Sequence, residues 1–271
     1  MVGPQWVLRV AAEGGDGFDA PTIDDFFPPA ILFGGTPFQI DRTWIIRIAA
    51  TVLLLGVLVF ASRRARLIPG RFQGAIEYVF DFVRIQISDE ILGSRTESRR
   101  YLPMLTTIFM TILIFNATGV IPGLNLAATA RIGVPLLLAV WVFVGYWAAG
   151  IRAHGLGGFL RNSLFPPGVP WPVYFVLAPI ELLQLLIIRP ASLVIRLVAN
   201  MVAGHIMLAL CFAATQFFVV HAAPALRAIG ALTLGAGIFM TVFELLVAFL
   251  QAYIFTLLAA SYIQMSLEQE H

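Results

Sequence analysis

Arg196 stands out among the charged residues of this sequence because it lies between long apolar runs. A guanidinium keeps its charge at physiological pH, and a charged side chain at membrane depth costs about 2.5–3.5 kcal/mol on insertion scales. A long side chain near a helix end can extend to the lipid headgroups instead, but apolar sequence continues well past Arg196 in both directions. The position therefore predicts a fixed positive charge with a function inside a membrane.

Two other polar residues share a predicted helix face with Arg196. Ser192, Arg196 and Asn200 follow one another at intervals of four residues, which places them in one row along a helix. His205 comes nine residues after Arg196, a rotation of about 900°, so it lies on the opposite face and about 13.5 Å along the axis. One face thus carries a cation with polar neighbours, and another carries a titratable histidine.

A second apolar stretch carries Glu244 and Gln251, which are seven residues apart and share a helix face. His205 could meet Glu244 across a helix contact, and such a pair suits a proton relay because an imidazole titrates near neutrality and a carboxylate can exchange a proton with it. His205, Asn200 and Gln251 could instead make ordinary interhelical hydrogen bonds. Glu181 lies nearer the expected membrane edge, so it could be interfacial.

A buried cation needs a counter-charge, and the sequence offers two sources for it. The small residues Ala199, Ala203 and Gly204 permit close approach of another helix, so a partner chain could present a carboxylate to Arg196. Glu244 could supply the same charge from within this chain. Both sources remain open from the residues alone.

The composition sets the class of protein in which these side chains act. The chain has 271 residues, of which 59% are hydrophobic and 12% charged, as expected of an all-α polytopic membrane protein. All its basic residues are arginines, but they are spread along the chain and the net charge is only +2, which argues against nucleic-acid binding. Phosphate-binding loops, metal-ligand clusters and nucleophile elbows do not occur in the sequence, so we expect neither a cofactor nor catalysis of the kind soluble enzymes perform.

Apolar stretches divide the chain into a polar tail, residues 1–43, and a membrane domain, residues 44–271. The 48-residue stretch 173–220 would reach about 72 Å as one helix, whereas the hydrocarbon core is about 30 Å thick. Each of the last two stretches is therefore either a hairpin of two spans or one strongly tilted helix, and the absence of a polar turn in the last favours one helix. The predicted spans are 44–61, 101–121, 132–151, 173–220 and 228–267.

Residues 70–92 differ from the spans because apolar residues recur at helical spacing with charged residues on other faces. This pattern predicts an amphipathic helix on the membrane surface or, equally, a linker helix packed on a partner. Arginines are concentrated in residues 62–100 and recur in 152–170, which places both loops in the cytoplasm. The N-terminus then faces outward, and with five spans the C-terminus is cytoplasmic. The absence of a presequence and the arginine-rich loop favour a bacterial plasma membrane.

Four segments resemble the sequence of subunit a of F-type ATP synthases: Ser192–His205, Glu244–Phe255 and, more weakly, Tyr101–Pro103 and Phe115–Asn116. The resemblance covers about residues 44–267. It implies five membrane helices, of which the last two are long, strongly tilted and placed beside a rotor ring. It also implies that the chain is a membrane subunit, not an enzyme by itself. The implied partners are the c-ring subunits, subunit b of the peripheral stalk, the remaining synthase subunits and membrane lipids.

The resemblance also assigns roles to the polar residues. It implies two offset half-channels separated by Arg196, with Asn200 as the neighbouring amide. His205 and Glu244 belong to the half-channel open to the outside, in the order found in mitochondrial members and reversed in many bacterial ones. Protons would then enter through His205, Glu244 and Gln251.

The family has a glutamate of the inner half-channel upstream of the arginine. Here Glu181 takes that place, one residue further from Pro190 than the usual spacing.

Two other classes of protein also bury charges in membranes. A cation-coupled secondary transporter would show an internal repeat and a solute site, and no clear repeat occurs in this sequence. A purely structural scaffold would accept apolar residues at positions 205 and 244.

Overall fold

The structure, a computed structural model, describes residues 41–63, 70–121, 127–165, 170–220 and 227–268. Regular structure in these residues is entirely helical, and five helices are long and apolar enough to cross a membrane. The predicted class, an all-α polytopic membrane protein with five membrane helices, is confirmed. The predicted N-terminal tail lies outside the described residues, except for its last three. The five helices cover Arg42–Arg63, Arg95–Val120, Gly133–Leu164, Trp171–Val220 and Arg227–Leu267.

The chain forms two compact units. The first takes its described residues from the ranges 1–55, 112–131 and 198–250. The second takes them from 56–111, 132–197 and 251–271. The His205–Glu244 pair belongs to the first unit, and Arg196 and Gln251 belong to the second.

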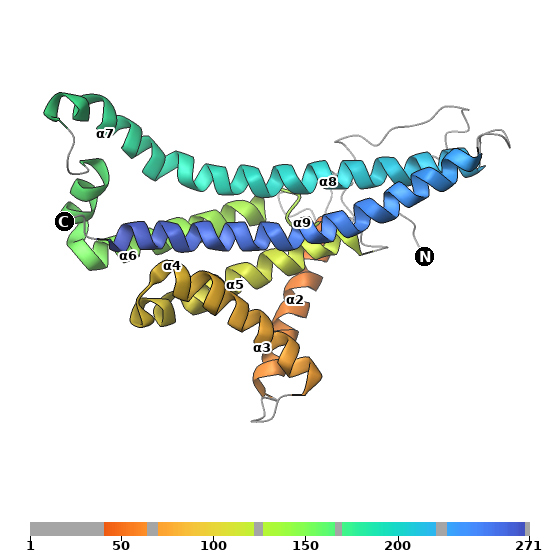
Figure 1. The fold of residues 1–271 in the computed structure, drawn as a ribbon, viewed down its shortest axis with the longest axis horizontal. Helices are drawn as coiled ribbons and strands as arrows, with labels where there is room; N and C mark the ends of the chain where they lie inside the picture. The colour runs from red at the N-terminus through yellow and green to blue at the C-terminus, as the bar shows by residue number, and fades with distance from the viewer. Residues whose placement is uncertain (1–40, 64–69, 122–126, 166–169, 221–226, 269–271) are drawn as a thin grey trace. The chain divides into compact units, whose positions relative to one another are not determined.

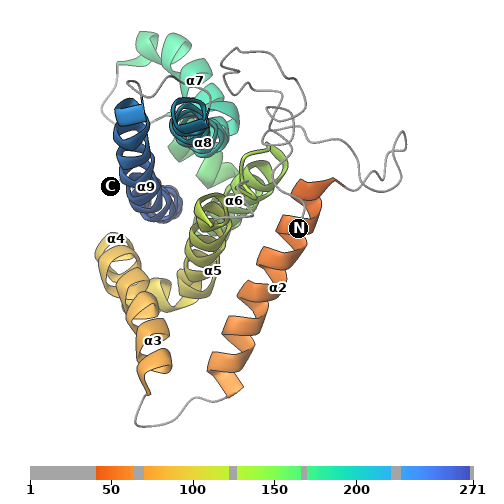
Figure 2. The ribbon, with the colours of Figure 1, turned by 90° about the vertical axis from the view of Figure 1, so that its right-hand side faces the viewer.

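The first membrane helix, α2 (Arg42–Arg63), is a single unbroken helix (Figure 2). Asp41 caps it, because its Oδ1 atom accepts a hydrogen bond of 3.1 Å from the backbone N–H of Trp44. Large apolar side chains such as Ile48 and Val52 are exposed along the helix. An apolar helix surface of this kind suits contact with lipid.

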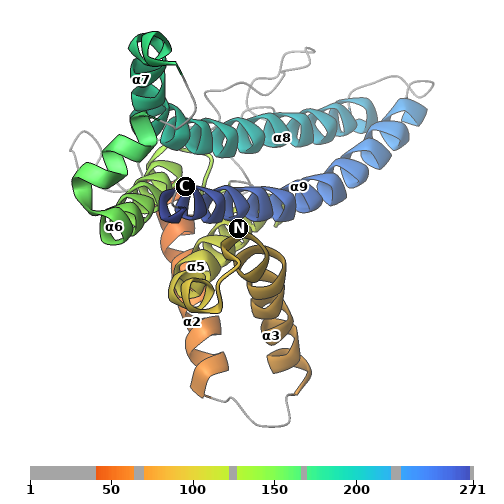
Figure 3. The same ribbon diagram turned by 60° about the vertical axis from the view of Figure 1, so that its left-hand side comes forward.

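The predicted amphipathic segment is helical, as α3 (Arg71–Val83), a π-helical turn η2 (Arg84–Asp89) and α4 (Glu90–Leu92). Gly93 follows with φ of 63°, a left-handed conformation that favours glycine, and the chain turns back into α5 (Arg95–Val120), so that α3 and the start of α5 form a helical hairpin (Figure 3). Phe82 packs on Phe109 with ring centroids 5.8 Å apart, and the Ser88 hydroxyl donates a hydrogen bond of 3.2 Å to the carbonyl of Ser98. The segment is therefore held to the chain itself by apolar and polar contacts.

The third membrane helix, α6 (Gly133–Leu164), continues well beyond the predicted end at residue 151. The prediction of a loop from 152 onward is wrong for residues 152–164, apart from a break at Gly155, where φ is 70° and ψ is 166°. The helical segment after the break is anchored by Phe159, which is buried and packs edge-on against Trp147 at 5.3 Å between ring centroids. Burial of this ring outweighs the low helix propensity of the glycines in this segment.

The fourth stretch consists of η3 (Trp171–Val173), α7 (Tyr174–Leu183), a π-helical turn η4 (Gln184–Ile188) and α8 (Arg189–Val220). The fifth is one helix, α9 (Arg227–Leu267). Each stretch is one continuous run of helix without a turn inside it, so the alternative of a hairpin within each stretch is wrong. At 1.5 Å per residue α9 is about 60 Å long, about twice the hydrocarbon thickness.

Within the first unit, the end of α8 and the start of α9 pack as an antiparallel hairpin (Figure 1). Glycines of α9 allow the close approach, because a Cβ atom at Gly230 would lie 2.8 Å from Val219 and one at Gly237 would lie 3.1 Å from Phe212. The hydroxyl groups of Thr215 and Thr233 form a hydrogen bond of 2.9 Å across the same interface. This hairpin positions His205 opposite Glu244.

Candidate functional site

His205 on α8 and Glu244 on α9 lie face to face in the first unit. The Nδ1 atom of His205 is 3.5 Å from Oε1 of Glu244, and the side chains are only 10% and 4% exposed. Gly204 lies beside the carboxylate, because a Cβ atom there would be 3.5 Å from the same oxygen, in ordinary van der Waals contact. Oε2 of Glu244 is buried and has no hydrogen-bond partner in the described part of the chain. A buried imidazole and carboxylate in this geometry can pass a proton between them.

Arg196 and Asn200 occupy a different face of α8. Both are exposed, as are their apolar neighbours Ile195 and Ala199, whereas Leu197 between them is fully buried. The helix therefore turns its guanidinium and amide outward in the middle of an apolar stretch. An exposed cation at that depth is costly against lipid, so this face suits contact with another protein chain that offers an anion or water.

The remaining predicted site residues lie at other places in the fold. Ser192 precedes Arg196 by one turn, and its hydroxyl donates a hydrogen bond of 2.9 Å to the carbonyl of Arg189. Gln251 is 2% exposed and lies about two turns after Glu244 on α9. Glu181 is half-buried in α7, before the π-helical turn η4. The structure thus brings one predicted pair, His205 and Glu244, into direct contact.

A second polar network, in the second unit, surrounds the start of α8. In the π-helical turn the backbone N–H of Arg189 bonds to the carbonyl of Gln184, and the next residue, Pro190, has no N–H to give to Leu185. The hydroxyl of Tyr146 donates a hydrogen bond to that buried Leu185 carbonyl. The Arg189 guanidinium lies 5.4 Å from the ring centroid of Tyr262 on α9, and the ring of Tyr262 packs edge-on against that of Tyr146.

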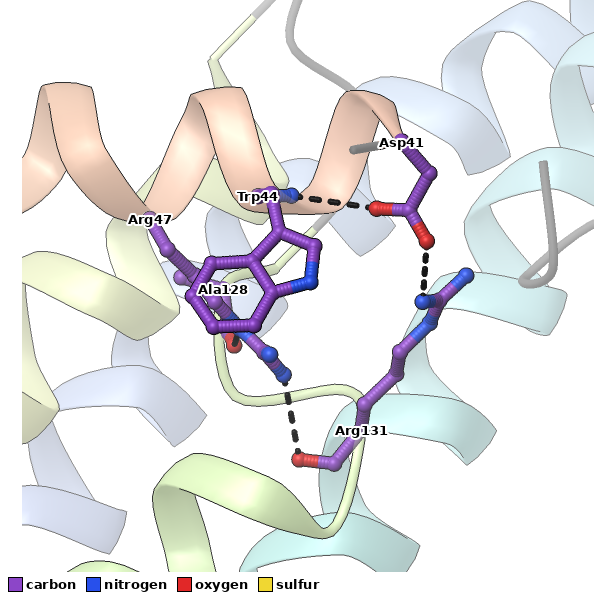
Figure 4. A network of polar contacts seen from close by, with 5 residues as sticks. All are labelled: Asp41, Trp44, Arg47, Ala128 and Arg131. Carbon is purple, nitrogen blue, oxygen red and sulfur yellow. Dashed lines mark hydrogen bonds and ion pairs between the residues drawn. The ribbon is translucent and has the colours of Figure 1, made fainter. Parts of the chain in front are cut away.

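A third network ties α2 to the chain segment after α5 and was not predicted from the sequence (Figure 4). Arg131 forms an ion pair with Asp41, and Nε of Arg47 donates a hydrogen bond of 3.0 Å to the carbonyl of Ala128. The sequence contained one signal for it. Arg47 interrupts an apolar span, as Arg196 does, and such a charge has to find buried partners.

Comparison with known proteins gives a consistent result. The family model described as ATP synthase A chain matches residues 44–264. A protein named ATP synthase subunit a from Rhodococcus erythropolis is 44% identical, over 97% of this chain and 95% of its own length. Proteins of the same name from Frankia alni and Parafrankia are 35% and 38% identical, over 95% and 96% of this chain and 88% and 87% of theirs. The chain is therefore a member of the ATP synthase A chain family.

Proposed function

We propose that this chain is the stator subunit that carries protons through the membrane sector of an F-type ATP synthase. The observation that carries the proposal is the division of polar groups on α8. The face with Arg196 and Asn200 is exposed, and the other face holds His205 against Glu244 in a buried site. One surface can thus meet a moving partner while the other serves a proton path. Family membership argues against the secondary-transporter and scaffold alternatives.

The proton path would use the two faces in sequence. Protons from outside pass through His205, Glu244 and Gln251 and neutralise a carboxylate on a rotor ring of c subunits. The neutral carboxylate crosses lipid as the ring turns, because an ionised one would be too costly there. The proton is released on the inner side, with Glu181 in the inner half-channel.

Arg196 would act as an electrostatic gate. Its fixed charge attracts the ionised ring carboxylate and repels protons that would otherwise pass directly between the half-channels. Each proton that crosses 100 mV provides about 2.3 kcal/mol, so several must be combined for each ATP. A tight, dry ion pair would hold the ring in place, because a desolvated pair is costly to separate. The exposure of Arg196 on its helix favours a hydrated, brief contact.

The proposal extends to the assembly and the membrane. The chain is not catalytic by itself. Its partners are the c-ring, subunit b of the peripheral stalk, the other synthase subunits and lipid, in a bacterial plasma membrane with the N-terminus outside and the C-terminus in the cytoplasm. Purification from the membrane together with a ring of small hairpin subunits supports this assembly, and purification without any ring subunit contradicts it.

The direct test replaces Arg196 with alanine and measures ATP synthesis driven by a proton gradient in membrane vesicles. We expect synthesis to fall to background, because the variant loses the positive charge that attracts the ring carboxylate and blocks a direct proton leak. Arg63→Ala, at an exposed helix end of α2, is the control and should leave synthesis unchanged. Substantial synthesis by Arg196→Ala would refute the gate, provided that the variant subunit is present in the complex at the wild-type amount.

A further inference from the structure

Residues 127–131 form a turn that follows α5 in the chain. Its first four residues are buried although its backbone is irregular. Ala127, Ala128 and Thr129 have no exposed surface, and Ala130 is 7% exposed. A buried turn has to satisfy its backbone polar groups without a helix or sheet. The N–H of Ala128 does so locally, with a hydrogen bond of 3.1 Å to the hydroxyl of Thr118 at the end of α5.

Two carbonyl groups of the turn accept hydrogen bonds from α2. Arg47 donates from Nε to the carbonyl of Ala128 at 3.0 Å and from Nη2 to the carbonyl of Arg131 at 3.5 Å (Figure 4). The Arg131 side chain pairs with Asp41, whose other oxygen caps α2 at the N–H of Trp44. A planar guanidinium can bond two carbonyls at once, which an ammonium group cannot do in the same geometry. The first turns of α2 thus hold both ends of the buried turn.

The other side of the turn packs on α8. Ala127, Ala130 and Met201 form one buried apolar cluster, with Val202 and Ile206 packed against it. Met201 precedes His205 by four residues, so the two side chains lie one above the other on the same face of α8. The turn therefore covers the part of α8 that presents His205 to Glu244.

We propose that Arg47 and the Asp41–Arg131 pair are positioning residues for proton transfer, a role that rests on the proposed function. They hold the turn against α8, and the turn fixes the position of the part of α8 that carries His205. The separation of 3.5 Å between His205 and Glu244 is at the long limit of a hydrogen bond. A small shift of α8 would therefore break the contact, and a misplacement of about 1 Å can cost about a hundredfold in rate.

The first test measures proton conductance in vesicles that contain the assembled membrane sector, per incorporated copy of this chain. Arg47→Met removes both carbonyl contacts at similar side-chain length, and we expect conductance to fall at least about tenfold, since two carbonyls of the turn lose their donor and the turn loses its hold on α8. Arg131→Gln should lower conductance. Arg131→Lys, which keeps the charge opposite Asp41, should conduct nearly as well as the wild type. Arg63→Met removes an exposed arginine from the same helix and should have no effect.

The second test asks whether the turn has left α8. In a Cys211→Ala background, Met201→Cys places a thiol where the native side chain is fully buried, so a maleimide should label it slowly. Adding Arg47→Met should raise the labelling rate at least about tenfold, because the same loss of carbonyl bonds increases the open population. An unchanged labelling rate contradicts the proposal, even if conductance falls.

The wild-type protein separates this inference from the proposed function. If wild-type vesicles conduct no protons, the proposed function fails. If they conduct and Arg47→Met conducts equally well, only the positioning role is refuted. Should Arg47→Met not be incorporated, Arg131→Gln and Asp41→Asn each remove one side of the ion pair, and wild-type conductance in both refutes the role.

Discussion

Gly204 allows the geometry of the His205–Glu244 pair to be tested through side-chain size. A Cβ atom at this position would lie 3.5 Å from Oε1 and 3.7 Å from Cγ and Cδ of Glu244, which is ordinary van der Waals contact. Gly204→Ala should therefore fit without displacing the carboxylate, and it adds up to about 1 kcal/mol of helix propensity. We expect its proton conductance to stay within about twofold of wild type, since no atom of the relay has to move.

Gly204→Val should behave differently. A γ-carbon reaches about 1.5 Å beyond the β-carbon, so it can come within about 2–3 Å of the carboxylate, inside the optimal separation of about 3.5–4.0 Å. Overpacking of this kind costs about 1–3 kcal/mol, equivalent to a fall in conductance of about fivefold to 150-fold if the strain displaces Glu244 from His205.

The assay is passive proton conductance of vesicles after removal of the catalytic sector, normalised to incorporated subunit. Gly235 on α9 provides the matched control, because a Cβ atom there would meet nothing within 4 Å. Gly235→Val should conduct like wild type. Wild-type conductance by Gly204→Val would refute the reasoning, and so would loss of conductance in Gly204→Ala, because both results would mean that room beside Glu244 does not control the relay.

Two further predictions concern the second unit and are measured by thermal unfolding in detergent. Tyr146→Phe should destabilise the protein by about 1–3 kcal/mol, because it leaves the buried carbonyl of Leu185 without a donor; an unchanged unfolding temperature would mean that water or another group replaces the hydroxyl. Gly150→Ala should destabilise by a similar amount, about 1–3 kcal/mol, since its Cβ atom would lie 2.3 Å from the buried ring of Phe159. Unfolding of Gly150→Ala at the wild-type temperature would show that the segment after Gly155 is not packed as described.

The sequence allowed us to predict the features that depend on helical periodicity and on polar residues within apolar stretches. His205 and Glu244 could be matched because each is a titratable group in a long apolar helix, and the structure shows them in contact; their part in proton transfer stays a prediction. The role of Arg196 also stays a prediction. Its helix face follows from the four-residue intervals between Ser192, Arg196 and Asn200. The helix face of each residue follows from local backbone geometry, whereas the pairing of His205 with Glu244, 39 residues apart, rests on the polar character of both side chains in apolar helices.

Features that depend on contacts distant in sequence could not be predicted in this way. Arg47 bonds a carbonyl 81 residues away, and no periodic pattern connects the two positions. The continuation of α6 past Gly155 depends on a pocket for Phe159, which composition cannot show. Tertiary packing decided both cases against the local signal.

The π-helical turn Gln184–Ile188 has a consequence for how this helix tolerates changes in length. This turn lies between Glu181 and Pro190, and a π turn takes in about one residue more than an α turn. The eight residues from Glu181 to Arg189 then advance the helix by about 700° instead of about 800°, so Glu181 lies about 20° from the direction of Arg189 instead of about 80°. We therefore expect a single-residue deletion at this place to restore a regular α-helix while Glu181 keeps its direction.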